Sequence, residues 1–399
     1  MTDAAPKFPA DAHITGVGLT AFGKDLGMSA LELQGTAAFA ALDDAGLTAR
    51  DVDTVIAGYA TTIQHIMPAN LLAEYIGARP DKAFGMSVGG ASGLGMVAEA
   101  ARLVRREEAG TVLVVGGENR ASGQSRDAAI ATLAQVGHAT HEVALGANIP
   151  AYYALLASEY LHRYGASRED LAQLAVQMRA HAGTHPGAQF TKPSTVEDVL
   201  AAPAIAEPLG LLDCCPVSDG GAAFVISNRT DGGRGVRIAG TGQANRHQHV
   251  SEADFTDFGA RESSQRALAE AGIGLGEIDV LGIYDSFTVT LAILLEEIGI
   301  AAPGTAGSMA GSGAFSASGR YPLNLHGGLL SYGHSGVAGG MAHLVEVVTQ
   351  IRGEAGARQL AHRPRRGLLH ADGGVLSAHI SLVVDGSPET HRRATEVIA

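Results

Sequence analysis

The chain has 399 residues, of which 46% are hydrophobic and only 17% are charged. This composition is typical of a compact globular protein, and the length predicts two similar halves or two domains. A formal net charge of −13 argues against nucleic-acid binding. No apolar run is long enough to span a membrane, and the polar N-terminus with Pro6 and Pro9 does not resemble a signal peptide. We therefore expect a cytoplasmic protein.

Strands and helices alternate along the first part of the chain. We predict strands near residues 14–20, 55–59, 83–88 and 111–115, and helices over 29–45 and 91–108. The strand at 111–115 is a continuous apolar run, which is typical of a strand covered on both faces.

The second part repeats this order. We predict strands near 236–240, 280–284, 367–370 and 378–384, and helices over 263–271, 289–298 and 341–351. Such alternation indicates mostly parallel sheets with helices on both faces. Residues from about 121 to 206 break the pattern with helices over 150–163 and 168–182, so we interpret them as an insertion. The predicted halves are 1–230, which includes this insertion, and 231–399.

The two cysteines, Cys214 and Cys215, are adjacent. Neighbouring cysteines rarely bridge, which excludes a disulfide framework. We interpret them as small buried side chains, with a nucleophilic role as the alternative. His138 and His141 have the spacing of a metal-binding pair, but no third ligand accompanies them, so we predict no metal site.

The most informative segment runs from Asn324 to Gly340 and reads Asn-Leu-His-Gly-Gly-Leu-Leu-Ser-Tyr-Gly-His-Ser-Gly-Val-Ala-Gly-Gly. Its glycines let the backbone approach a ligand closely. His334 precedes the helix expected from Met341, and free N–H groups at a helix start favour a developing anion. A glycine-rich helix start with a solvated histidine would produce the same pattern, so the segment alone leaves both interpretations open.

This segment resembles the catalytic-histidine loop of the thiolase superfamily. Four more motifs occur in that family's order: 111–119, 208–223, Ile283-Tyr-Asp-Ser-Phe287 and Asp372-Gly-Gly374. The resemblance extends from about Ile14 to Val384. It implies an α/β fold with two similar βαβαβαββ halves in a five-layer α-β-α-β-α body. It also implies an inserted loop domain over the acyl pocket, and a homodimer.

The chemistry depends on what this chain lacks. The position of the family's nucleophilic cysteine falls at Gly90, and that of its second cysteine at His370. Neither residue can form a thiolate, so the acyl-cysteine route is closed. We expect the space at Gly90 to accept a bulky substrate carbon. One reading of this loss is a non-catalytic acyl-CoA- or lipid-binding subunit.

Three residues favour retained activity: His334, Tyr284 at the position of the family's Asn or His, and Tyr332. Each tyrosine alone is more often a packing residue, but phenols donate and accept protons where thiols did. The combination resembles the steroid side-chain-cleaving aldolases of the superfamily, which lack the thiolase cysteines. That resemblance implies retro-aldol cleavage of a 3-hydroxyacyl-CoA into a ketone or aldehyde and a shorter acyl-CoA. It also implies a companion protein with a zinc ribbon and an OB fold.

In this interpretation Tyr284 and Tyr332 carry the two proton transfers, and their order stays open. Backbone N–H groups near Gly90 and from Asp372 to Gly374, together with His334, would hold the thioester oxygen. We expect His326 to line the pocket. Coenzyme A enters as part of the substrate, and no tightly bound cofactor is expected. The alternative enzyme is a cysteine-independent acyltransferase or thiolase that uses His334 alone.

Overall fold

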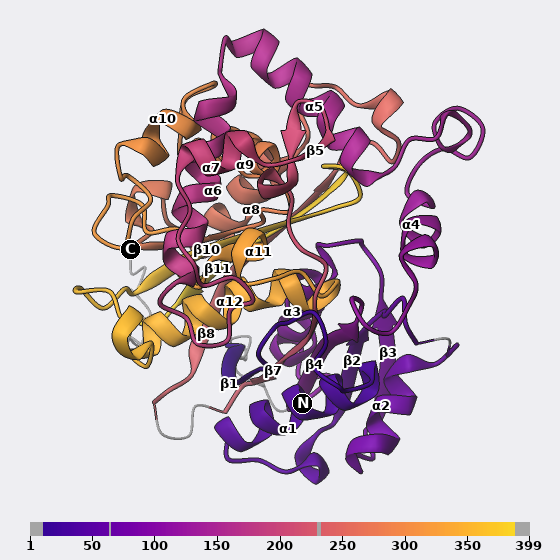
Figure 1. The fold of residues 1–399 in the computed structure, drawn as a ribbon. Coiled ribbons are helices and arrows are strands. Elements are labelled where there is room, and N and C mark those ends of the chain that lie inside the picture. The colour runs from indigo at the N-terminus through magenta and orange to yellow at the C-terminus, as the bar shows by residue number, and fades with distance from the viewer. Residues whose placement is uncertain (1–10, 64, 230–232, 388–399) are drawn as a thin grey trace, which may run out of the picture.

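The computed structural model describes residues 11–63, 65–229 and 233–387. The N-terminal stretch with Pro6 and Pro9 and the expected boundary at 230/231 lie outside these residues. The first half is shown in indigo to magenta in Figure 1. Its elements are β1 (His13–Leu19), α1 (Ala30–Asp44), β2 (Thr54–Gly58), α2 (Pro68–Ile76), β3 (Lys82–Met86), α3 (Ser92–Arg105), β4 (Thr111–Asn119) and, after a long excursion, β7 (Asp219–Ser227).

The excursion between β4 and β7 is mainly helical. Its elements are α4 (Arg126–Ala134), α5 (Ile149–Tyr164), α6 (Arg168–Ala182), α7 (Val196–Ala201), β5 (Ala204–Ala206) and β6 (Leu209–Gly210). Helices α5 and α6 pack against a helix of the second half, α9 (Thr288–Ile298). Every residue of α9 is buried, because the helix lies between these helices and the rest of the second half.

The second half follows in salmon to yellow (Figure 1). Its elements are β8 (Val236–Asn245), α8 (Ala260–Ala271), β9 (Val280–Ile283), α9, α10 (Ala306–Gly311), α11 (Gly328–Ser331), α12 (Val337–Arg352), β10 (Arg366–Gly373) and β11 (Ala378–Asp385). The first half has the expected βαβαβαββ order. In the second half the third strand is reduced to a bridge, in which Leu323 pairs with Leu281 of β9.

The strands are ordered β3-β2-β4-β7-β1-β8-β11-β10-β9. Strands β1 and β8 pair over only two positions, His13 with Arg237 and Ile14 with Val236, so the sheets of the two halves meet there. The prediction of mostly parallel sheets is wrong. In the described chain, β2 runs parallel to β3 and β4, and β9 runs parallel to β10, whereas the central pairings are antiparallel. In the first half the cause is β7, a strand not predicted, which returns antiparallel between β4 and β1. In the second half β11 returns antiparallel between β8 and β10.

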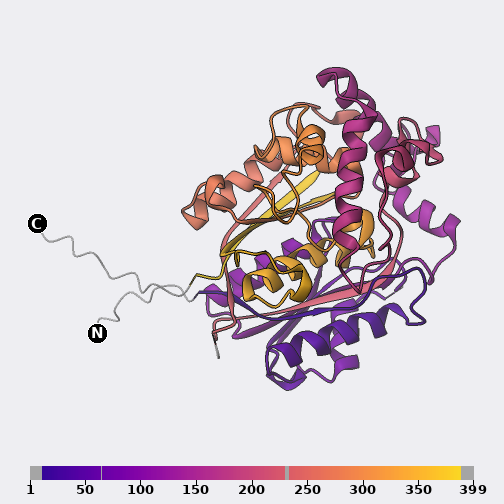
Figure 2. The ribbon, with the colours of Figure 1, turned by 60° about the vertical axis from the view of Figure 1, so that its left-hand side comes forward.

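Five layers stack as expected (Figure 2). Helices α1 and α2 cover the outer face of the first sheet, and α8 and α9 cover the second. Helices α3 and α12 form the middle layer and contact strands of both halves. Since both sheets bury a face on these two helices, the starts of α3 and α12 lie close together in the interior.

Helix α12 begins at Val337, four residues before the predicted start. The first turn therefore contains Gly339 and Gly340, and both are needed for close packing. A Cβ atom on Gly339 would lie 2.6 Å from the Leu329 side chain, and one on Gly340 would lie 3.1 Å from the Gly90 carbonyl oxygen.

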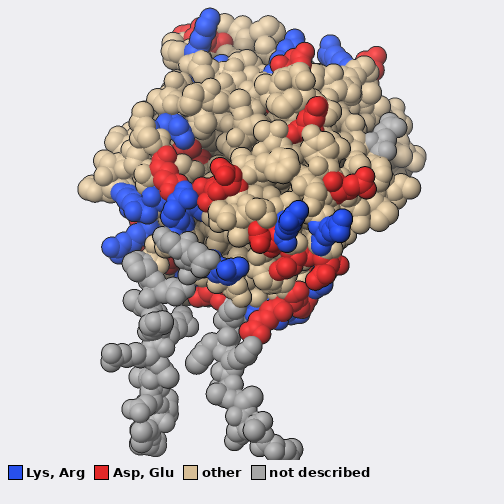
Figure 3. All heavy atoms as spheres, turned by 90° about the horizontal axis from the view of Figure 1, so that it is seen from below, with Lys and Arg blue, Asp and Glu red and all other residues tan. Residues whose placement is uncertain are grey.

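The face seen in Figure 3 carries acidic and basic side chains side by side. The net charge of −13 is therefore not gathered there into a single acidic patch. Within the described residues, no helix is both long and apolar enough to cross a membrane.

Candidate active site

The glycine-rich loop holds His334 at the start of α12. The His334 N–H donates to Ser218 Oγ at 3.0 Å, and the Ser218 N–H donates to the His334 carbonyl at 3.0 Å. Gly333 and Gly336 turn the chain on either side with φ of 135° and 61°, a region that other residues rarely adopt. The two hydrogen bonds between His334 and Ser218 thus hold the loop against the segment that leads into β7.

Tyr284 directly follows β9, and its hydroxyl oxygen lies 2.9 Å from Nε2 of His334. The Gly336 N–H donates to Nδ1 of the same ring at 3.1 Å, so Nδ1 is an acceptor. A neutral imidazole with an accepting Nδ1 carries its hydrogen on Nε2. His334 therefore donates to the Tyr284 oxygen, and the phenolic hydrogen is left for another acceptor.

Burial controls the charge of both groups. It lowers the pKa of His334 to about 3, and the positive charge of Arg120 adds to the effect. Burial also raises the pKa of Tyr284 well above its usual value, as does the negative charge of Asp372. At neutral pH the imidazole is uncharged and the phenol is protonated, so Tyr284 in this state is a proton donor.

Gly90 lies directly against this pair. A Cβ atom built on Gly90 would be 2.2 Å from the Tyr284 hydroxyl oxygen and 2.6 Å from the Asp372 carbonyl oxygen. The expectation that the absent side chain leaves room for substrate carbon is therefore wrong, because the phenol fills that space. A phenol from the second half thus occupies the place where the superfamily's cysteine side chain would project from the first half.

Asp372 lies on β10 and is 1% exposed. Its Oδ2 lies 3.3 Å from the hydroxyl of Tyr153, a residue of α5 that the sequence did not indicate. The same hydroxyl is 3.3 Å from the Gly374 carbonyl, and the Tyr153 ring stacks on Phe287 at a centroid distance of 4.2 Å. Burial raises the pKa of Asp372 to about 7. The site thus contains a carboxyl group that changes charge near neutral pH.

Tyr332 lies elsewhere. Its hydroxyl donates to the Thr20 carbonyl at 2.9 Å, and its ring packs against Phe22 and His185, each at 4.8 Å. It also faces His326 at 5.3 Å. The structure therefore does not bring Tyr332 to His334, and its proton-transfer role stays a prediction that this geometry does not support.

His326 is 1% exposed, and among the described residues neither of its ring nitrogens has a hydrogen-bond partner. Its ring lies 4.8 Å from that of His343, which bonds to Asp285 at 3.1 Å. His370, at the position of the second cysteine, bonds to Ser381 at 2.8 Å and is likewise buried. Both histidines belong to the packed interior beside the Tyr284–His334 pair.

Both cysteines are free. Burial raises the pKa of the Cys214 thiol to about 12, and it raises that of Cys215 further. These thiols are protonated at neutral pH, which disfavours a nucleophilic role. Among the described residues, no group of three or more His, Cys, Asp or Glu side chains could hold a metal ion.

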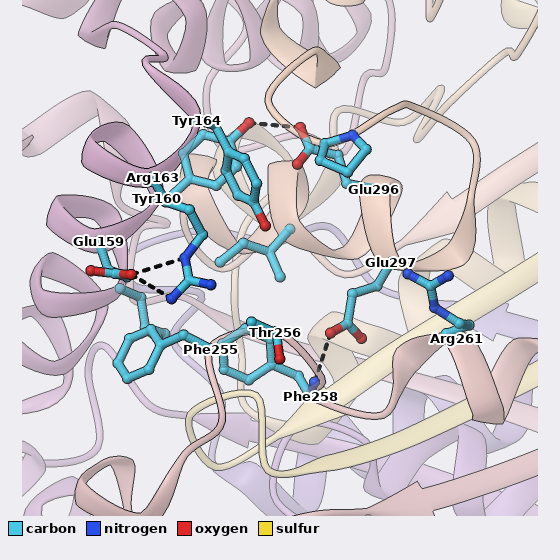
Figure 4. A pocket seen from close by; sticks show the side chains of 13 residues that line it. Glu159, Tyr160, Arg163, Tyr164, Phe255, Thr256, Phe258, Arg261, Glu296 and Glu297 are labelled. Atoms are coloured by element: carbon cyan, nitrogen blue, oxygen red, sulfur yellow. Dashed lines mark hydrogen bonds and ion pairs between the residues drawn. The ribbon is translucent and has the colours of Figure 1, made fainter.

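A separate cavity of about 60 Å³ lies at the other end of α5 and α9 (Figure 4). There the Tyr160 hydroxyl donates to Glu296 at 2.7 Å, and Arg163 pairs with Glu159 at 2.6 Å. The carboxylate of Glu297 accepts the Phe258 N–H at 2.6 Å. Ligand pockets usually exceed about 300 Å³, so this cavity is too small for an acyl-CoA.

Comparisons with known proteins agree with the fold. Residues 12–230 match the family model described as "Thiolase, N-terminal domain", and residues 242–385 match "Thiolase C-terminal domain-like". A steroid side-chain-cleaving aldolase of Thermomonospora curvata is 34% identical over 86% of this chain and 91% of its own length. An acetyl-CoA acetyltransferase of Methanothermobacter thermautotrophicus is 30% identical over 93% of this chain and 99% of its own.

A solved structure described as an Ltp2-ChsH2(DUF35) aldolase superposes with a TM-score of 0.81 at 32% identity, covering 95% of this chain and 98% of its own. The chain therefore belongs to the thiolase superfamily. The chain has Gly90 and His370 at the two positions expected for the superfamily's cysteines, and two of the proteins it is similar to are named as aldolases. It is a carbon–carbon lyase of this superfamily.

We predict that Gly90→Cys does not create thiolase activity. The new Cβ would overlap the Tyr284 hydroxyl, and such overpacking typically costs about 1–3 kcal/mol of stability. Acetoacetyl-CoA cleavage and thermal unfolding measure the two effects. Gly274→Cys is the control, because a Cβ at that position meets no atom within 4 Å. Efficient thiolysis by Gly90→Cys would contradict this account.

We predict that Asp372→Asn becomes more stable relative to the wild type as the pH rises. The folded-state pKa of Asp372 is raised from 3.8 to about 7, so its stabilising contribution is complete below 3.8 and lost as the pH rises through 7. Asparagine does not titrate. Between about pH 5 and about pH 7 the difference in unfolding free energy should change by roughly 2–3 kcal/mol in favour of the variant. Denaturant titrations at each pH measure it, and a pH-independent difference would contradict the raised pKa.

Proposed function

We propose that the chain cleaves a 3-hydroxyacyl-CoA by a retro-aldol reaction, in the breakdown of a steroid side chain. The products would be a ketone or aldehyde and a shorter acyl-CoA. The observation that carries the proposal is the Tyr284 hydroxyl, which fills the space beside Gly90 and bonds to His334 at 2.9 Å. The relatives named as aldolases support it.

A retro-aldol cleavage needs no covalent intermediate. The C–C bond between the α and β carbons breaks, its electron pair forms the thioester enolate, and the β-hydroxyl loses its proton as the carbonyl forms. When the substrate binds, the thioester oxygen, where negative charge develops, would replace the Tyr284 oxygen as the acceptor of Nε2–H of His334. The phenol of Tyr284, protonated at neutral pH, would return a proton to the α carbon.

The acyltransferase alternative receives less support from the site. Gly90 provides no nucleophile, and the thiols of Cys214 and Cys215 are held in the protonated form. Incubation with an acyl-CoA followed by mass spectrometry of the intact protein separates the two functions. An acyl adduct on the protein would favour the transferase.

We predict that Tyr284→Phe lowers turnover of a 3-hydroxyacyl-CoA by about 10²–10⁴-fold, the usual contribution of a general acid or base. Phenylalanine has nearly the same volume, so thermal stability should change little. The control is Tyr160→Phe, which removes another buried phenol from its carboxylate partner, Glu296, in the separate cavity of Figure 4. A Tyr284→Phe enzyme with more than about a third of wild-type turnover would be inconsistent with this role.

We further propose that the chain forms a homodimer and acts with a companion protein. The dimer is supported by β3, a partly exposed strand at the edge of the sheet with β2 on one side, because such an edge can pair with another copy. The companion is supported by the solved relative, whose description names two components, Ltp2 and ChsH2(DUF35).

We predict a dimer by light scattering at micromolar concentration for the chain alone, and a larger complex when a DUF35-type companion is added. Turnover of the 3-hydroxyacyl-CoA should depend on that companion. A monomer under these conditions would remove the dimer proposal. Full turnover by the rigorously purified single chain would remove the companion proposal.

A further inference from the structure

The proposed cleavage still needs a group that takes the β-hydroxyl proton. Tyr284 is protonated at neutral pH, and His334 carries its hydrogen on Nε2. Neither is a free base in this state. The carboxyl group of Asp372, whose main chain lies against Gly90, is a group of the required type.

We propose that Asp372 is the general base that takes the proton of the 3-hydroxyl group, and that Tyr153 positions it. This inference rests on the proposed retro-aldol function and adds a residue to it. From the sequence, only the backbone N–H groups from Asp372 to Gly374 were assigned a role, and they were expected to bind the thioester oxygen. The carboxyl group of Asp372 now receives a separate role.

One oxygen of the Asp372 carboxyl group is an unsatisfied hydrogen-bond acceptor. Oδ1 of Asp372 is buried and, among the described residues, has no hydrogen-bond partner. Leaving a buried charged acceptor unpaired is costly, so such an atom marks a place where a donor is expected to bind. A substrate hydroxyl group is a donor of the right kind.

Asp372 also lies close to Tyr284 and Gly90. The Asp372 main chain and the Tyr284 hydroxyl both lie within 2.6 Å of the point where a Gly90 Cβ would be. The main chain of Asp372 thus lies beside the phenol that fills the vacated position, and the negative charge of the Asp372 carboxyl group acts on this phenol. The cleavage needs a base for the β-hydroxyl oxygen and an acid for the α carbon, and we assign these two roles to the carboxyl group of Asp372 and the phenol of Tyr284.

Asp372 and the two neighbouring tyrosines differ in charge state near neutral pH. The negative charge of Asp372 raises the pKa of both Tyr153 and Tyr284. When the carboxyl group ionises, the two phenols are held in the protonated form. A base is most effective when its pKa is near the working pH, which a pKa of about 7 satisfies and a phenol does not.

Tyr153 fixes the carboxylate. Its hydroxyl donates to Oδ2 at 3.3 Å, and its ring is held by the stack on Phe287. Oδ2 is thereby engaged, whereas Oδ1 has no hydrogen-bond partner among the described residues; the backbone N–H of Leu376 also acts on the carboxyl group and lowers its pKa. Because Tyr153 acts through Asp372, it is a positioning residue.

The protons balance over one turnover. Asp372 gains the hydroxyl proton as the C–C bond breaks, and Tyr284 loses its proton to the α carbon. The carboxylic acid and the phenolate then exchange one proton, either directly or through water, and both groups return to their starting states. No oxidant, reductant or co-reactant is consumed.

Four titratable groups surround Asp372: Tyr153 from α5, Tyr284 after β9, His379 from β11, and His370 on its own strand. Burial lowers the pKa of His379 to about 4 and that of His370 well below its usual value. Both histidines are neutral near pH 7, and both phenols are protonated there. A titration near pH 7 in the rate profile that disappears in Asp372→Asn is therefore assigned to Asp372.

The test is the pH profile of turnover for wild type, Asp372→Asn and Tyr153→Phe, measured with the companion present on a panel of 3-hydroxyacyl-CoA substrates. Wild-type turnover should fall as the pH drops through about 7, because the base becomes protonated. Asp372→Asn should lose about 10²–10⁴-fold in turnover with little change in KM, and its residual rate should lack that acid limb.

Tyr153→Phe should be affected less, and its acid limb should move to higher pH, because the hydrogen bond from Tyr153 lowers the pKa of Asp372. This shift is a readout that a purely structural tyrosine would not give, and it stands even if Asp372→Asn folds poorly. The matched control is Tyr160→Phe. It removes the other phenol–carboxylate bond of α5, at 2.7 Å, and should leave the profile unchanged.

The outcomes separate the two proposals. Wild-type cleavage together with an Asp372→Asn variant that keeps more than about a tenth of the turnover and the same acid limb would overturn the assignment of Asp372 and leave the aldolase standing. An unmoved acid limb in Tyr153→Phe would overturn the positioning role. No cleavage of any 3-hydroxyacyl-CoA by the wild type would remove the proposed function and this inference together.

Discussion

Two sheets share one middle layer of helices, and the site depends on how closely that layer is packed. The starts of α3 and α12 meet there, and they approach so closely that side chains are excluded. A Cβ on Gly93 would lie 2.4 Å from Met341, and one on Gly340 would lie 3.1 Å from the Gly90 carbonyl oxygen. Close packing keeps bulk water out, so burial is the main influence on the pKa of each ionisable group at this point.

Burial separates the pKa values of the groups that meet there. The imidazole of His334 becomes harder to protonate, the phenol of Tyr284 becomes harder to ionise, and the carboxyl of Asp372 titrates near neutral pH. One low dielectric environment thereby produces a neutral hydrogen-bond donor, a proton donor and a candidate base. Their different roles follow from their chemical type, because desolvation always disfavours the charged form.

Much of the fold could be predicted from the sequence, because buried strands and amphipathic helices leave a periodic signal. The strand β7 was missed since its run begins with Asp219-Gly-Gly and looks like the end of a loop. The parallel-sheet prediction failed in the first half for the same reason, and in the second half because β11 also returns antiparallel, between β8 and β10. The start of α12 was placed too late because glycines normally argue against helix, while here the packing of α12 requires them.

In the site, Gly90, Tyr284 and His334 were found from motifs, and the structure brings these three together. Tyr332 was placed with them because it lies two residues from His334, but Gly333 between them has a φ of 135°, and the tyrosine instead bonds to Thr20. Tyr153 gave no signal. It is one of several tyrosines in a helix, and its partner Asp372 is 219 positions away.

The halves contribute unequally to the chemistry. Tyr284, His334 and Asp372 come from the second half, whereas Gly90 in the first half contributes space for a phenol. The excursion between β4 and β7 adds Tyr153, which lies on α5 against α9. The same helix therefore packs over the second half and holds the carboxyl group of Asp372. A displacement of α5 would also move Tyr153 away from Oδ2, so the position of this helix and the pKa of the Asp372 carboxyl group are linked through one hydrogen bond.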